Sequence, residues 1–194
     1  DQAHIEGMNQ AFCDTLIAGD TITNPERFVG LQPRLGTPSA TKTVSGYNMI
    51  SGAGDGVNVQ TSIYLVVWGA NTVHGIYPKG SKAGLAVRDL GEVTLDDGDG
   101  GRYQGYRTHY KWDCGLTVRD WRYVVRICNI DVADLVANST PPDLITLMTK
   151  AINRVPNLGA GRAVFYCNRT VKTMLEVQAF SAVKAGGGLT YQNV

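Results

Sequence analysis

KWDCGLTVRDWRYVVRICNID, residues Lys111 to Asp131, is the stretch around which the chain is organised. From Asp120 to Cys128 successive residues alternate between two sets, which is typical of a half-buried β-strand because neighbouring side chains point to opposite faces. One set is wholly apolar, and the other carries Arg122 and Arg126. Aromatic and β-branched residues dominate, which favours strand over helix. The pattern predicts a strand at the centre of a hydrophobic core.

The composition is that of an ordinary globular protein. Of 194 residues, 43% are hydrophobic and 18% charged, which argues against disorder and is enough for one core. The formal net charge is +1 and no segment concentrates basic residues, so a dedicated nucleic-acid binder is disfavoured. No run of residues is long and apolar enough for a membrane span, and the first residues do not resemble a signal sequence.

The N-terminal third is predicted to hold two helical segments and a long loop. Apolar residues recur at helical spacing from His4 to Ile17, and Gly19 is placed to end that helix. Asn24, followed by Pro25, is typical of a helix start, which predicts a second, short helical segment. Residues 36–56 are rich in Ser, Thr, Gly and Asn and predict a long surface loop.

The middle of the chain reads as strands. The continuous apolar run in Ser62–Gly69 predicts a strand covered on both faces at the centre of a sheet. Extended structure is expected again over Val73–Tyr77. Residues 91–110 predict a β-hairpin, with Asp96–Gly101 as a turn that needs positive φ at several positions.

The last third predicts two helices and a strand. Thr140 is expected to cap a helix that has Pro141 at its first position and an apolar stripe reaching Val155. A short buried strand is expected over Arg162–Cys167, and Asn168 is expected to cap a second amphipathic helix. Strands and helices in this order predict an α+β fold.

Most motifs that would indicate chemistry fail on their spacing. Residues 75–82 have the glycines of a phosphate-binding loop, but lysine and hydroxyl stand in reversed order and Pro78 removes an amide donor. The acidic residues at 96–99 lack the order of a calcium loop. The cysteines form no Cys-x-x-Cys pair and lie in apolar segments, which predicts reduced, buried thiols. Neither catalytic residues, nor cofactor-binding residues, nor metal ligands are predicted.

Charged residues in and near the opening stretch are the candidate site. With no phosphate loop or catalytic base nearby in sequence, pairing of arginines with carboxylates, within one chain or between subunits, is the favoured interpretation. The candidate ion-pair residues are Arg119, Arg122, Arg126, Asp113, Asp120 and Asp131.

Four stretches together resemble a known family. They are NPERFVGLQPRL (24–35), WGANTVHGIYPKGSKAGL (68–85), YKWDCGLTVRDWRYVVRICNID (110–131) and GRAVFYCNRTV (161–171). In this order they are similar to the major capsid proteins of tailed bacteriophages and prophages. The resemblance implies the HK97-like capsid fold, no active site and no cofactor.

The resemblance also implies a domain organisation. Residues 1–194 would form a single α+β unit containing parts of the peripheral and axial lobes of such a capsid protein, with the lobe boundary near residues 131–142. Members of this family are usually longer at the N-terminus, and this sequence does not start with Met. We therefore expect a fragment that lacks the N-terminal arm and extended loop, and that is a monomer or weak oligomer.

The implied function is structural. The full-length protein is expected to form hexamers and pentamers of itself, to assemble in the bacterial cytoplasm into an icosahedral virion shell around DNA, and to contact that DNA only non-specifically. Scaffold, portal or decoration proteins are its other expected partners. The loop 36–56 and the turn 96–101 are expected to contact neighbouring subunits, because both are exposed and tethered to strands.

Two other classes of function compete with this interpretation. A small-molecule or carbohydrate-binding α+β module would use Trp68, Trp112 and Trp121 as ligand platforms, although a tryptophan within an apolar strand more often lies in a core. A hydrolase with dispersed catalytic residues would depend on His74 or His109. Members of a catalytic triad can be distant in sequence, but this sequence has no Gly-x-Ser-x-Gly elbow.

Overall fold

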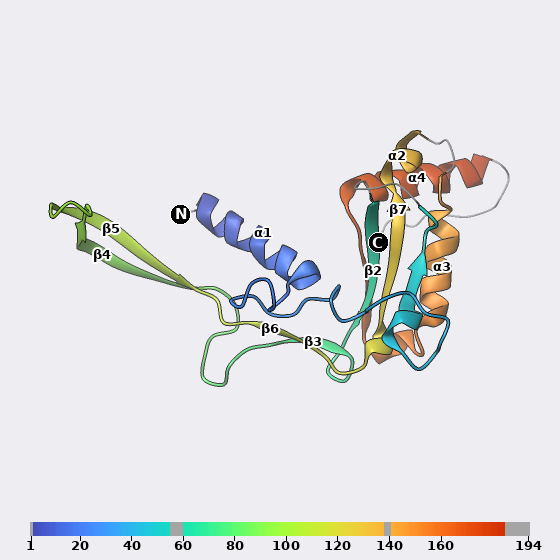
Figure 1. The fold of residues 1–194 in the computed structure, drawn as a ribbon, viewed down its shortest axis with the longest axis horizontal. Coiled ribbons are helices and arrows are strands. Elements are labelled where there is room, and N and C mark those ends of the chain that lie inside the picture. The colour runs from blue at the N-terminus through green and yellow to red at the C-terminus, as the bar shows by residue number, and fades with distance from the viewer. Residues whose placement is uncertain (1, 55–59, 138–140, 185–194) are drawn as a thin grey trace. The chain divides into compact units, whose positions relative to one another are not determined.

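A computed structural model describes residues 2–54, 60–137 and 141–184. These residues form a mixed α+β structure (Figure 1), as the sequence predicts. The helices are α1 Gln2–Ala18, α2 Val132–Ala137, α3 Leu144–Arg154 and α4 Arg169–Lys184, with short 3-10 helices η1 Ser45–Asn48, η2 Trp121–Tyr123 and η3 Leu158–Ala160. The strands are β1 Met49–Ser51, β2 Gln60–Trp68, β3 Val73–Ile76, β4 Ala86–Asp96, β5 Arg102–Lys111, β6 Gly115–Val118, β7 Val124–Asp131 and β8 Arg162–Tyr166.

The chain divides into two compact units. The sheet unit comprises residues 1–74 and 118–194, and the hairpin unit comprises the intervening residues 75–117. The predicted change of lobe near residues 131–142 would lie inside the sheet unit, and it stays a prediction.

One mixed sheet organises the sheet unit. Within this unit its strand order is β1-β7-β2-β3, with β8 also paired to β2. β7 and β8 are both antiparallel to β2, and these two neighbours place β2 in the centre of the sheet, as its continuous apolar run predicts. β1 pairs with β7 in parallel. β8 is only partly buried, which corrects the prediction of a buried strand.

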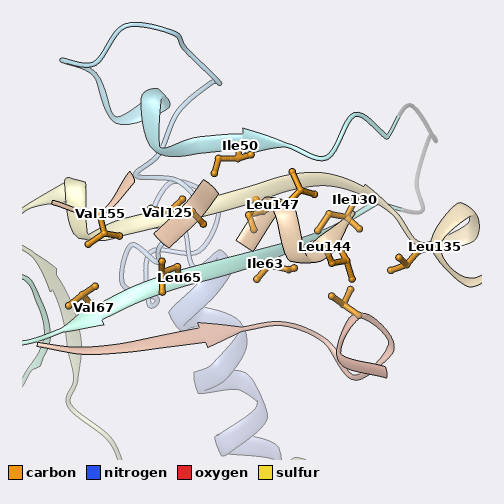
Figure 2. Close-up of a cluster of buried hydrophobic side chains, with 13 residues drawn as sticks. Ile50, Ile63, Leu65, Val67, Val125, Ile130, Leu135, Leu144, Leu147 and Val155 are labelled. Carbon is orange, nitrogen blue, oxygen red and sulfur yellow. The ribbon is translucent and has the colours of Figure 1, made fainter. Parts of the chain in front are cut away.

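The hydrophobic core lies between this sheet and the helices that follow it. Figure 2 shows side chains of β2, β7 and α3 pointing toward one another. α3 contributes the apolar stripe that its sequence predicts, since residues at helical spacing share one face. The buried cluster comprises Ile50, Ile63, Leu65, Val67, Val125, Ile127, Ile130, Leu135, Leu144, Leu147, Ala151, Val155 and Val171.

A β-bulge interrupts the alternation of β7. Thr61 pairs with Ile130 but Ile63 pairs with Ile127, so β7 advances three residues where β2 advances two. In a regular strand, residues three apart face opposite sides. The extra residue of the bulge changes this, so that Ile127 and Ile130 of β7 both point into the core. Asn129, within the bulge, has φ 56°, a left-handed conformation that Asn tolerates better than most residues.

The second face of β7 is also covered, which corrects the expectation of an exposed arginine-bearing face. Val124 and Cys128 on that face are buried, as is Tyr64 of β2. Leu31 and Leu35, from the loop after α1, are each 1% exposed, and both lie beside Val124. The predicted start of the strand at Asp120 is wrong as well, because η2 intervenes and β7 begins at Val124.

Other local predictions have mixed outcomes. The helix α1, the extended segment β3, the β4–β5 hairpin and the Asn168 cap are confirmed, the cap by a 2.7 Å bond from the Val171 amide to Asn168 Oδ1. The short helix predicted after Asn24 is wrong, because the chain there forms turns.

The predicted loop 36–56 instead contains η1 and β1. β1 has too few residues to show a periodicity, and its partner β7 lies far along the sequence. At α3 the N-cap is Asp143, so Pro141 precedes the helix rather than starting it. Thr140 lies outside the described residues.

The cysteines are free, but they are not all buried. Cys128 is buried, whereas Cys13 and Cys167 are exposed and Cys114 is intermediate. Burial raises the pKa of Cys128, Cys114 and Cys167. The prediction of reduced, buried thiols therefore holds in full for Cys128 alone, because helical and loop positions in apolar sequence can still face solvent.

Candidate functional site

The predicted ion-pair residues do not gather at one site. Arg122 and Asp120 are brought together, with Nη2 and Oδ2 2.6 Å apart, and Asp120 also accepts a 3.0 Å bond from the Arg122 amide at the start of η2. The hydrogen bonds from Arg122 lower the pKa of Asp120 and raise that of Arg122. Asp113 instead pairs with Lys111, at 2.8 Å. Both pairs join near neighbours in sequence.

The remaining candidates have structural contacts of other kinds. Arg126 donates from Nε to Ser62 Oγ at 3.2 Å, and its guanidinium carbon lies 5.7 Å from the centre of the Tyr64 ring. Asp131 is 7% exposed and its Oδ1 accepts amide bonds from residues 133 and 134, so it caps α2. The Arg119 amide donates to the Thr72 carbonyl at 2.8 Å. Their roles between subunits stay predictions.

A polar anchor that the sequence did not reveal centres on Asn48. This side chain is 1% exposed, and its Nδ2 donates to the carbonyls of Trp121, Arg122 and Val124 at 3.3, 3.0 and 3.0 Å. It thereby fixes η1 to the chain entering β7. The partners are more than 70 residues apart in sequence, so no local pattern could have indicated the contact.

Arg154, at the end of α3, holds the same segment from the other side. Its Nη1 donates to the carbonyls of Tyr47 and Met49, and its guanidinium carbon lies 4.6 Å from the centre of the Tyr47 ring. Together Asn48 and Arg154 attach residues 47–49 to both β7 and α3. The segment predicted as a long loop, 36–56, is therefore anchored at residues 47–49.

The hairpin unit exposes much of its surface. β4 and β5 form a two-stranded antiparallel ribbon, visible in Figure 1, and an isolated two-stranded ribbon is marginally stable in water. Among its apolar side chains, Tyr106 is 81% exposed, Tyr103 54% and Val87 53%. The turn between the strands has positive φ at Gly98 and Gly100, as predicted. Such a ribbon gains most stability when another surface covers it.

A groove in the sheet unit offers a second exposed apolar surface. It has a volume of about 760 Å³ and lies between α2, α3 and α4. Val136 and Val177, both about half exposed, line it together with Met174, and Asp143 and Ser181 supply polar groups. We call this the three-helix groove.

Asp143 is the carboxylate of this groove. Its Oδ1 accepts from the Thr146 amide at 3.0 Å and its Oδ2 accepts from the Thr146 hydroxyl at 2.5 Å. These hydrogen bonds lower its pKa from the ordinary value. The side chain is therefore anionic at neutral pH while it caps α3.

The Asp143 cap predicts a pH dependence of stability. A folded-state pKa below the unfolded value means that the stabilisation is present above the unfolded pKa and is lost as the pH falls through the folded one. The free energy of unfolding, measured with urea, should therefore fall less for Asp143→Asn than for the parent chain between about pH 6 and about pH 3. Asn keeps a capping oxygen, so the helix is retained. If the free energy of unfolding fell equally with pH in the two chains, this prediction would be contradicted.

Side-chain groups typical of metal sites are not assembled in the described ranges. Among residues 2–54, 60–137 and 141–184, no three or more His, Cys, Asp or Glu residues are grouped to hold a metal ion. In the same part of the chain, no helix combines the length and apolar character that crossing a membrane requires.

Trp68 donates from Nε1 to the Tyr166 hydroxyl at 2.8 Å, a contact between β2 and β8 within the sheet.

Comparison with known proteins identifies one family. A family model described as "Major capsid protein GP7" matches residues 1–194. The match extends over both the sheet unit and the hairpin unit. No curated protein matches the chain.

Proposed function

The chain belongs to the GP7 family of major capsid proteins, and on this premise we propose that it is the head subunit of a tailed bacteriophage or prophage with an HK97-like fold. Membership of the family makes it a structural subunit of a virus shell. The observation that carries the proposal is the match over the whole chain, since it includes both the packed sheet unit and the exposed hairpin.

The proposed fold has support from the arrangement of elements. A sheet packed against helices and a separate long hairpin suit a shell subunit, which needs a rigid body and an exposed element for its neighbours. We propose that residues 1–194 contain parts of both a peripheral and an axial lobe, with their boundary near residues 131–142. The apolar stripe of α3 against β7 supplies the rigidity that such a body requires.

We propose a purely structural role without catalysis. His74 lies on β3 and His109 on β5; His74 belongs to the sheet unit and His109 to the hairpin unit. Trp68 bonds to Tyr166 inside the sheet, a structural use of its indole. These observations support a shell protein over a hydrolase or a ligand-binding module.

The proposed assembly uses copies of the same chain. Hexamers and pentamers form first and close into an icosahedral shell, because one heterologous contact repeated by rotation generates rings. Synthesis and assembly take place in the bacterial cytoplasm, with scaffold, portal or decoration proteins as further partners and DNA touched only non-specifically. These hexamers and pentamers are those of the full-length protein, whereas residues 1–194 alone are a monomer or weak oligomer, which a stable hexamer by light scattering would contradict.

The hairpin turn and the loop 36–56 are the proposed contacts between subunits. Residues 96–101 sit at the end of a ribbon whose side chains are largely exposed. The loop is firmly attached at its end by Asn48 and Arg154, so its exposed part is presented from a fixed base. A contact element needs both exposure and attachment to a rigid body.

Shortening the hairpin turn tests the proposed function. We expect that replacing Asp96–Gly101 by Asn-Gly, which still permits a tight hairpin turn, leaves the subunit folded but prevents shell formation. Electron microscopy of particles from the producing cells reports assembly, and circular dichroism of the purified subunit reports folding. Normal shells from the shortened chain would contradict the role of the turn. Failure of the unaltered full-length gene product to form any shell would contradict the function itself.

A further inference from the structure

The two faces of the β4–β5 ribbon carry opposite charges. The register of the two strands pairs Ala86 with Lys111, Arg88 with His109, Val93 with Gly105 and Leu95 with Tyr103, and paired residues share a face. Arg107 lies on the same face because side chains alternate along β5. We call this the basic face, since it carries Arg88, Arg107 and Lys111.

The opposite, acidic face is defined by the other pairs of the register. It carries Asp89, Glu92 and Asp96, opposite Thr108, Tyr106 and Arg102. Tyr106 donates from its hydroxyl to Glu92 at 2.9 Å, and Gln104 donates to Thr94 at 3.0 Å. These cross-strand bonds satisfy polar groups of this face, which also carries the exposed side chains of Val87 and Tyr106.

On the basic face Lys111 pairs with Asp113 at 2.8 Å, and apolar groups lie beside Arg88 and Arg107. The Leu95 side chain lies over Gly105, where an added Cβ would come within 2.7 Å of it. Leu95, Val93 and the half-exposed Tyr103 thus form a continuous apolar strip, with Arg107 next to it along β5. A surface that complements this face must be apolar and carry negative charge.

The three-helix groove has that character. Its lining includes the apolar side chains Val136, Met174 and Val177, together with the carboxylate of Asp143. Asp143 caps α3, so it is held in place rather than free to turn away. The side chains that line the groove include no lysine or arginine, and Lys150 of α3 lies near enough to contribute to the lowered pKa of Asp143.

We propose that the basic face of the hairpin of one copy binds in the three-helix groove of a second copy. This inference rests on the proposed function, which requires contacts between identical chains, and it names the two surfaces that meet. Charge complementarity selects the occupant: the apolar strip covers the valines and Met174, and Arg107 or Arg88 approaches Asp143. The strand β4 has 11 residues, which at about 3.3 Å per residue give the ribbon a long surface for such a contact.

The contact is heterologous, because a hairpin on one copy meets a groove on the next. Each copy then offers both an unused hairpin and an unused groove, so the contact can repeat around a ring. The acidic face stays exposed on the other side of the ribbon. The contact would also cover apolar side chains that both surfaces otherwise expose to water.

A charge swap tests the pairing of the two surfaces. Arg107→Glu should lower the yield of shells about tenfold or more, because it places a carboxylate against the groove. Ser181→Lys, on the groove wall, should lower it as well, and the double variant should recover most of the yield. Gln104→Glu is the matched control, since it adds a carboxylate to the opposite face and should leave assembly unchanged.

A cross-link between different chains gives a second readout. In a background with Cys13, Cys114 and Cys167 changed to Ser, one chain carries Tyr103→Cys and another carries Val177→Cys. Mild oxidation of the mixed, assembled chains should produce a disulfide-linked heterodimer on a non-reducing gel. Because each chain holds only one of the two new thiols, a contact within a single chain cannot produce it.

The outcomes separate this inference from the proposed function. Shells that form normally but give no heterodimer, or a double variant no better than Arg107→Glu alone, would overturn the pairing and leave the capsid function standing. Circular dichroism of each purified variant shows whether the chain is folded. Should Arg107→Glu fail to fold, Arg88→Glu replaces it in the same swap.

Discussion

Replacing Asn48 by Asp lowers the free energy of unfolding of the sheet unit by about 3–5 kcal/mol. The substitution keeps the size of the side chain but removes the Nδ2 donor that serves three carbonyls. A carboxylate oxygen then faces those carbonyl oxygens at a site that is 1% exposed. The unpaired buried carbonyls and the repulsion between oxygens both lower the free energy of unfolding.

Urea unfolding followed by circular dichroism measures this effect. Asn48→Ala should also destabilise, through the unpaired carbonyls, but it introduces no charge and should cost less than Asp. Asn24→Asp is the control, because Asn24 is exposed and the same chemical change there should shift stability by less than about 0.5 kcal/mol. Equal stabilities for Asn48→Asp and the parent chain would show that the anchor is dispensable.

Gly161→Ala is expected to destabilise the same unit by about 3 kcal/mol. An added Cβ at this position would lie 2.1 Å from the carbonyl oxygen of Trp68. The atoms that it would meet, in Trp68 and Gly69, are backbone atoms, at the place where the chain enters β8 beside the end of β2. The clash is therefore relieved only by separating the strands. No side chain can move aside to accommodate it.

A second glycine provides a contrast of opposite sign. Gly7 lies within α1, and an added Cβ there meets nothing within 4 Å. Gly7→Ala should therefore stabilise α1 by up to about 1 kcal/mol, because alanine has the higher helix propensity. Thermal unfolding of the two variants separates the mechanisms, and a neutral Gly161→Ala would contradict the close approach of β2 and β8.

The stability predictions bear on the proposed role as a shell subunit. Asn48 and Arg154 hold residues 47–49 against β7 and α3, and the preceding loop is a proposed contact between subunits. A loss of 3–5 kcal/mol is a large part of the stability of an ordinary domain. We therefore expect Asn48→Asp to reduce the yield of shells by reducing the amount of folded subunit.

Sequence patterns were most informative where a signal is local. Helical spacing located α1 and α3, a continuous apolar run located β2, and the glycines at 98 and 100 marked the turn of the hairpin. Local competition explains the error at α3, where Asp143 rather than the predicted Thr140 is the cap. Both are good capping residues, and the choice between them depends on where the helix packs.

The candidate site was less predictable than the fold. Arg122 and Asp120 are two residues apart, and they are the pair of candidates that the structure brings together. The anchor at Asn48 joins segments more than 70 residues apart, and the three-helix groove requires the packing of three separate helices. Neither leaves a periodicity or spacing in the sequence that could be recognised beforehand.

The sequence by itself determined the fold class, most of the helices and strands, and the capsid family, because each depends on residues that are near neighbours or on a motif kept in order. Only the tertiary structure decided which faces are covered. The bulge at Asn129 brings Ile127 and Ile130 to one side of β7, and Leu31 and Leu35 bury the face expected to be open. A strand pattern specifies alternation, but the burial of each face depends on segments that arrive from elsewhere in the chain.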